Sequence, residues 1–133
     1  MQRRELAKYA VLGVAAAAVL PVASRAAGGD PNENVVFTEA DPGHWAKAAS
    51  LHIPETTVAG GKVTIKTPHP QSEIHYIVSH SLILGDGTFV SRKTFSYKDE
   101  PVSEHALPAG YKGKVTVTST CNQHDFWVKS ISV

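Results

Sequence analysis

The chain has 133 residues, of which 42% are hydrophobic and 19% charged, and its formal net charge is +1. This length favours one compact domain, and the balanced charge, with no Lys/Arg cluster beyond the first residues, excludes the basic surface that nucleic-acid binding requires. The one Cys excludes an intramolecular disulfide and any metal site built from two Cys of one chain, whereas seven His are a large number for this length.

The first 26 residues are typical of an export signal. A basic start with Arg3 and Arg4 precedes an apolar stretch from Tyr9 to Leu20, and small residues follow up to Ala26. This order predicts a secretory signal, and the paired arginines make it similar to a twin-arginine signal. The apolar stretch is shorter than the roughly 20 residues of a spanning helix, so we expect cleavage rather than a retained membrane anchor. The sequence therefore predicts a periplasmic protein whose only membrane contact is through the signal segment.

Residues 27–42 begin with polar, turn-forming residues and are predicted to be a flexible lead-in. The segment that follows, residues 43–133, has one expected helical turn at 44–49 and then short runs in which apolar and polar residues alternate. These runs cover residues 62–66, 74–84 with an interruption at His80, 88–97, 115–118 and 127–133, with a Pro-bounded segment at 101–108. The pattern predicts an all-β fold, an antiparallel β-sandwich of about seven strands.

Four His and the Cys have the settings of metal ligands. His52 follows the expected helical turn, His69 is held between two prolines that restrict its backbone, and His75 comes six residues later. Cys121 and His124 are three residues apart in a turn-like segment after a strand, so both can reach one ion. A thiolate with neutral imidazoles suits iron, copper or zinc and does not suit calcium or magnesium.

Each of these residues alone has an ordinary structural explanation. A single buried Cys is commonly a small hydrophobic side chain of the core, and a single His near a strand end is commonly solvated or hydrogen-bonded. We assign this structural role to His44, His80 and His105, which lie in loop-like segments or on the apolar face of a strand.

Three segments taken together resemble the iron-binding domain of superoxide reductases, the neelaredoxin and desulfoferrodoxin family. They are Leu51-His52-Ile53-Pro54, then Pro68-His69-Pro70 with His75-Tyr76-Ile77, and Cys121-Asn122-Gln123-His124 with Trp127. The resemblance covers residues 43–133. It implies an immunoglobulin-like β-sandwich with one mononuclear iron, and the single Cys matches the members that bind one iron only.

The resemblance also implies a ligand set and an activity. Four imidazoles in a plane, from His52, His69, His75 and His124, would bind the iron, with the Cys121 thiolate as axial ligand. Superoxide would be reduced by one electron to hydrogen peroxide, with two protons consumed, and an external donor, expected to be a small redox protein, would re-reduce the iron. Copper or zinc in place of iron, and a homo-oligomer, are both compatible with the sequence.

The chain departs from the family pattern in two places. Most members have Glu-Lys directly before the first ligand His, where the Glu binds ferric iron and the Lys guides superoxide, whereas this chain has Ser50 and Leu51. Lys47 is the nearby candidate for steering the substrate. A Gly commonly follows the last ligand His, and Asp125 stands there instead.

The missing Glu-Lys pair favours an alternative interpretation. On the same scaffold, the chain would be a non-catalytic protein that binds iron or copper, or a redox sensor. A third interpretation is a thiol carrier that acts through Cys121 without a metal, but it leaves four ordered His without a role.

Overall fold

The computed structural model describes residues 29–133, so the export signal expected in residues 1–26 lies outside the described residues. The fold described below is that of the second of the chain's two units, Asn32–Val133. Among residues 29–133, no helix has the length and the apolar character needed to cross a membrane.

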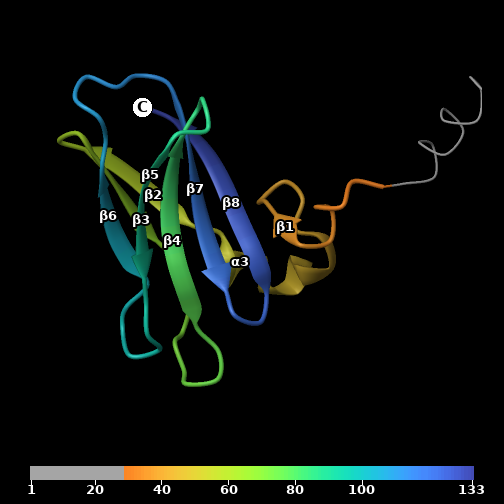
Figure 1. The fold of residues 1–133 in the computed structure, drawn as a ribbon. Coiled ribbons are helices and arrows are strands. Elements are labelled where there is room, and N and C mark those ends of the chain that lie inside the picture. The colour runs from red at the N-terminus through yellow and green to blue at the C-terminus, as the bar shows by residue number, and fades with distance from the viewer. Residues whose placement is uncertain (1–28) are drawn as a thin grey trace, which may run out of the picture. The chain divides into compact units, whose positions relative to one another are not determined.

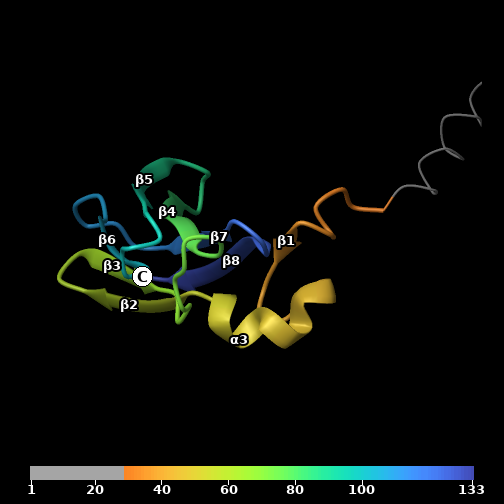
Figure 2. The same ribbon diagram turned by 90° about the horizontal axis from the view of Figure 1, so that it is seen from below.

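The second unit is a β-sandwich of eight strands in two sheets, which confirms the predicted fold class (Figure 1). One sheet has the order β1-β8-β7-β4-β5, formed by Val36–Phe37, Asp125–Ser132, Lys114–Cys121, Ile77–Leu84 and Phe89–Thr94. The other has the order β2-β3-β6, formed by Glu55–Ala59, Lys62–Lys66 and Val102–Ala106. Figure 2 shows the two sheets as two layers.

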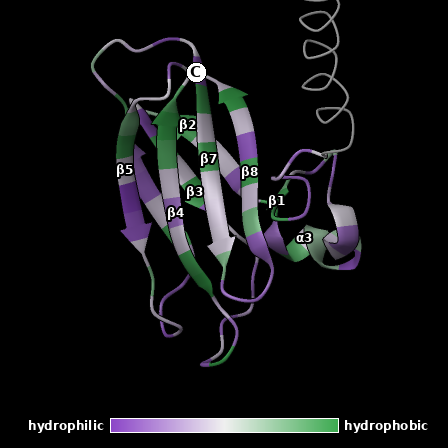
Figure 3. Cartoon of the chain, turned by 45° about the vertical axis from the view of Figure 1, so that its right-hand side comes forward, coloured by the Kyte–Doolittle hydropathy of each residue, from purple (hydrophilic) through white to green (hydrophobic). Residues whose placement is uncertain are grey.

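The core between the sheets follows from the alternation of residues along the strands. Every second residue of β3 and β7 is buried, and hydrophobic and hydrophilic positions alternate along the strands in Figure 3. The core residues come from β3, β4 and β7 and are Val63, Ile65, Leu82, Leu84, Val115 and Val117. Because successive side chains of a strand point to opposite faces, this burial fixes which face of each strand is turned inward.

His80 does not interrupt its strand, which corrects the interruption predicted there. It lies within β4 and pairs with Ser119 of β7, and its side chain is fully buried. Its ring nitrogens are each 2.8 Å from a hydroxyl oxygen, Nε2 from Thr67 and Nδ1 from Ser103. Ser103 is also 2.8 Å from His105 Nε2, so both histidines have the hydrogen-bonded structural role expected of them.

The predicted lead-in is too long at its C-terminal end, because β1 belongs to the sandwich. Val36 and Phe37 pair in parallel with β8, the one parallel pair among the described strands. Phe37 is 1% exposed, and the centroid of its ring lies 5.5 Å from the centroid of the Trp127 ring. Gly43, with φ +52°, allows the chain to pass Phe37, since a Cβ there would come within 2.7 Å of that ring.

The helical segment is longer than the single turn expected at residues 44–49. It consists of a 3₁₀ helix, η1 (Gly43–Ala48), and one turn of α-helix, α3 (Ala49–His52). Its last residue, His52, is buried. The segment therefore places His52, the first candidate ligand, inside the domain.

Candidate metal centre

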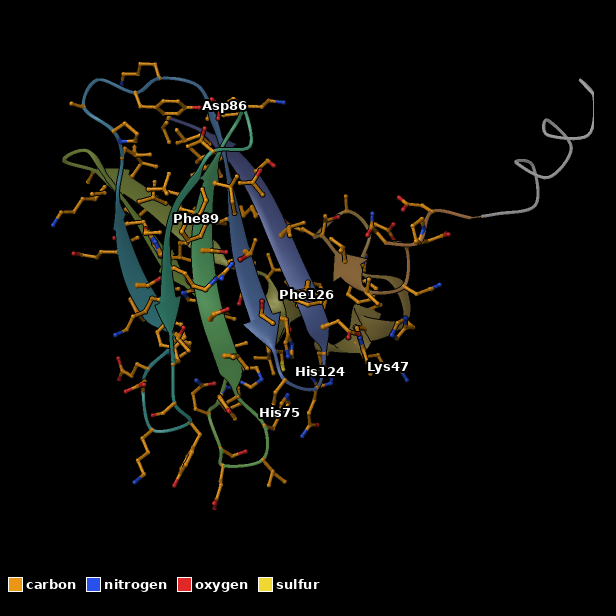
Figure 4. All side chains as sticks on the ribbon, in the orientation of Figure 1. Lys47, His75, Asp86, Phe89, His124 and Phe126 are labelled. Carbon is orange, nitrogen blue, oxygen red and sulfur yellow. The ribbon has the colours of Figure 1, made fainter. Side chains whose placement is uncertain are left out.

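The candidate ligands come from three connections that meet at one end of the sandwich. In Figure 1, α3, the loop between β3 and β4 and the turn between β7 and β8 all lie at this end. His52 ends α3, His69 and His75 lie on the β3–β4 loop, Cys121 is the last residue of β7, and His124 lies in the β7–β8 turn. Figure 4 shows His75 and His124 together here, at the end opposite to Asp86.

The five side chains converge. One ligand atom from each of His52, His69, His75 and Cys121 lies within 4.8 Å of the ligand atoms of the other three. His124 adds a fifth atom, because its Nδ1 is 2.9 Å from His75 Nε2 and 3.5 Å from Cys121 Sγ. His69 Nε2 is 3.1 Å from His75 Nε2 and 4.0 Å from Cys121 Sγ. Residues up to 72 positions apart in the sequence thus surround one point.

Hydrogen bonds outside the cluster orient two of the imidazoles. The ring N–H at Nδ1 of His52 donates to the Ala48 carbonyl oxygen over 2.7 Å, so the lone pair is at Nε2. The corresponding Nδ1–H of His69 donates to Gln71 Oε1 over 3.0 Å, which again leaves the lone pair at Nε2. In both rings the nitrogen that faces the cluster is therefore the one able to bind a metal.

His52 Nε2 is buried and has no hydrogen-bond partner in the described part of the chain. A buried polar atom without a partner costs about 1–3 kcal/mol, and a metal ion bound at this nitrogen would remove that cost. The four imidazoles and the thiol also form a donor set that suits iron, copper or zinc. The residues present therefore fit a metal ion of this class.

The protonation states also suit a metal. Burial and, to a smaller extent, the neighbouring His rings lower the pKa of His52 to about 4, against the opposing effect of its hydrogen bond to Ala48. Burial also lowers the pKa of His69 and of His75. These imidazoles are therefore neutral near pH 7, as ligands must be. Burial raises the pKa of the Cys121 thiol, so metal binding there would release a proton.

Comparison with known proteins shows the family to which this chain belongs. The family model for desulfoferrodoxin matches residues 45–130. The chain belongs to the desulfoferrodoxin family. No curated protein sequence matches the chain.

Solved structures of superoxide reductases share the fold. The superoxide reductase (1Fe-SOR) from Giardia intestinalis is 25% identical over 63% of this chain and 99% of its own, with a TM-score of 0.56. The superoxide reductase from Treponema pallidum is 26% identical over 61% of this chain and 67% of its own, with a TM-score of 0.52. The superoxide reductase (neelaredoxin) from Ignicoccus hospitalis is 21% identical over 79% of this chain and 98% of its own, with a TM-score of 0.65, which shows the fold.

In this member of the desulfoferrodoxin family, two of the segments that carry candidate ligands are hydrogen-bonded to each other. Asn122 Oδ1 accepts the backbone N–H of Tyr76 over 3.0 Å, and Asn122 Nδ2 donates to the Ile74 carbonyl oxygen over 3.1 Å. Gln123 Nε2 donates to the same oxygen over 2.7 Å. These bonds hold the β7–β8 turn against the loop that carries His75, so the distance between the two segments is fixed by the protein.

The positions that depart from the family pattern lie at the edge of this site. Leu51 is 44% exposed directly before His52, and it brings neither charge nor a hydrogen-bonding side chain. Lys47 lies on η1, and Figure 4 shows it beyond His124 as seen from His75. Its role in steering substrate stays a prediction.

Sequence reasoning missed three groups that contact the candidate ligands: the Ala48 carbonyl, Gln71 and Trp45. The Trp45 ring lies edge-on to the His124 ring with 4.6 Å between centroids, and its Nε1–H donates to Asp125 Oδ2 over 2.9 Å. The sequence contains a weak indication of the role of Gln71, since an amide side chain two residues after His69 in a Pro-bounded loop can reach that ring. The contact between Trp45 and Asp125 spans 80 residues and has no signal in the sequence.

Proposed function

We propose that this protein is a superoxide reductase that reduces superoxide by one electron to hydrogen peroxide at a single iron. The ligands proposed are His52, His69, His75 and His124 through ring nitrogens and Cys121 through sulfur. The proposal is supported chiefly by the convergence of these four imidazoles and one thiol in a chain of the desulfoferrodoxin family. When bound, the iron would supply the one-electron couple that this reaction requires.

The charges of the chain's own groups favour an anionic substrate. Neutral imidazoles add no charge, and the Cys121 thiolate adds one negative charge, so a divalent ion leaves the site with a net charge of +1. This charge attracts superoxide, and the attraction falls as salt screens it. Because Leu51 stands where most members of the family have Lys, steering depends on the charge of the site itself.

Solvent is the proposed source of the two protons. His75 and His124 are only half-buried, so the cluster reaches water on their side. Ser50 and Leu51 provide no acidic or cationic group that could deliver a proton at the site. An external one-electron donor, in the form of a small redox protein, completes the cycle. Export to the periplasm is proposed from the signal-like residues 1–26.

A non-catalytic iron or copper protein on the same fold, or a redox sensor, is the second candidate. The observation that favours it is the exposed Leu51 at the position of the usual Lys. Copper binds more tightly than iron at most nitrogen and sulfur sites, so the metal taken up by the chain bears on this choice.

A superoxide pulse separates the two candidates. The iron-loaded protein is reduced, mixed rapidly with superoxide, and followed by the absorbance of the ferric form and by the yields of hydrogen peroxide and oxygen. The proposal predicts oxidation faster than uncatalysed dismutation, with one hydrogen peroxide for each superoxide and no oxygen. The metal-free protein is the control. Oxidation no faster than uncatalysed dismutation would instead favour the non-catalytic candidate.

A further inference from the structure

Asp125 has a backbone conformation that an L-residue rarely adopts. Its φ is +64°, the only positive φ among the described non-glycine residues. The left-handed region disfavours side chains with a Cβ, although Asp and Asn tolerate it better than most residues. Glycine would occupy this turn with less strain, and strain of this kind is commonly kept where a side chain has a specific task.

The Asp125 side chain makes one long-range contact. Its Oδ2 accepts the indole N–H of Trp45 over 2.9 Å, and both residues are half-buried. Trp45 lies at a kink inside η1, where its φ of −95° and ψ of 17° are not helical. The hydrogen bond that the Asp125 carboxylate accepts therefore fixes the indole at a point where the helix is kinked.

The Trp45 ring in turn packs against a candidate ligand. It lies edge-on to the His124 ring, with 4.6 Å between the ring centroids. His52 and His69 are each oriented from outside the cluster by a hydrogen bond at Nδ1. His124 presents Nδ1 to the cluster, and the contact described for its ring outside the cluster is with Trp45.

We propose that Asp125 and Trp45 are positioning residues for His124. The Asp125 carboxylate holds the Trp45 indole against the His124 ring and thereby keeps Nδ1 directed at His75 Nε2 and Cys121 Sγ. The backbone of His124 is held independently, because Trp127 Nε1 donates to its carbonyl oxygen over 2.9 Å. This inference rests on the metal site of the proposed function, but not on reaction with superoxide.

Release of Co²⁺ tests the inference without reference to activity. The protein is loaded with Co²⁺, mixed with excess chelator, and followed by the thiolate-to-cobalt absorption and by the ligand-field bands, which report the coordination geometry. The variants are Asp125→Gly, Asp125→Asn, Trp45→Phe and the double variant Asp125→Gly with Trp45→Phe. Glu39→Gln is the matched control, since it removes an exposed carboxylate near η1 outside the site.

Asp125→Gly and Trp45→Phe should each release Co²⁺ about tenfold faster and shift the ligand-field bands, a change equivalent to about 1.4 kcal/mol. The double variant should be no faster than either single variant, because both remove the same bond. Asp125→Asn should stay within about threefold of the wild type, since its amide oxygen accepts the indole N–H. The metal-free Asp125→Gly protein should unfold near the wild-type temperature, because the strain that glycine relieves at this φ offsets the stability lost with the hydrogen bond.

Wild-type release rates in Asp125→Gly or Trp45→Phe would overturn the inference. So would an Asp125→Asn rate equal to that of Asp125→Gly, which would assign the effect to charge alone. Failure of the superoxide pulse would refute the proposed activity and leave these rates unaffected, so the two failures are distinguishable.

Discussion

Acidification should destabilise the metal-free protein through His80. This side chain is fully buried between the sheets, with hydroxyl oxygens of Thr67 and Ser103 at its two ring nitrogens and the Phe95 ring edge-on at 4.9 Å. Burial, together with the neighbouring His105, lowers the pKa of His80 to about 3. The folded protein therefore holds His80 neutral well below the ordinary pKa of 6.5.

The free energy of unfolding falls with acidification because the unfolded state binds a proton at His80 more readily than the folded state. Below pH 6.5 the unfolded chain protonates His80 and the folded chain does not, so acid favours unfolding. The stability contribution is complete above pH 6.5 and is lost as pH falls toward the folded pKa near 3. Relative to pH 7, the free energy of unfolding should fall by about 2 kcal/mol at pH 5 and about 3 kcal/mol at pH 4 from this residue alone.

Denaturant unfolding of wild type and His80→Gln at pH 7, 5 and 4 measures this contribution. Glutamine can still hydrogen-bond Thr67 and Ser103 but does not titrate, so the variant should lose about 2 kcal/mol less than the wild type between pH 7 and 5. Equal losses in both proteins would refute the reasoning. If the variant does not fold, NMR titration of the wild-type His80 ring gives the same answer, and a midpoint above pH 5.5 would contradict it.

Three further changes test other parts of the structure. Cys121→Ser should abolish the charge-transfer colour of the oxidised iron protein and weaken metal retention, since a hydroxyl is a poor substitute for a thiolate; unchanged colour and metal content would exclude sulfur ligation. Leu51→Lys should speed superoxide association severalfold at low salt and less at high salt, and an unchanged rate in stopped-flow would show that charge there does not steer substrate. Phe37→Ala should lower the free energy of unfolding by about 3 kcal/mol, because the side chain is buried. A loss below about 1 kcal/mol in a urea titration would show that β1 does not pack as part of the core.

The alternation of residues was sufficient to predict the central strands. β3 and β7 were readable from sequence because each buries one face and exposes the other. β2 was missed because four of its five residues are exposed and it lies at the edge of its sheet. β1 was missed because two residues in a parallel pair leave no periodic pattern.

The candidate site was also only partly predictable from the sequence. The proposed ligands could be named from local motifs, since His69, His75, Cys121 and His124 lie in short, distinctive segments, and the structure brings these residues together with His52. The groups that orient them could not be named, because the bond from Trp45 to Asp125 depends on how distant segments pack. Ligation itself stays a prediction until a metal is observed.

X-ray absorption at the iron edge of the ferrous protein tests the proposed ligation most directly. It measures the number and kind of atoms bound to iron, independent of any assay for superoxide. The proposal predicts one sulfur and four imidazole nitrogens, with the sulfur lost in Cys121→Ser and one nitrogen lost in His52→Ala. A shell without sulfur, or one that His52→Ala leaves unchanged, would contradict it.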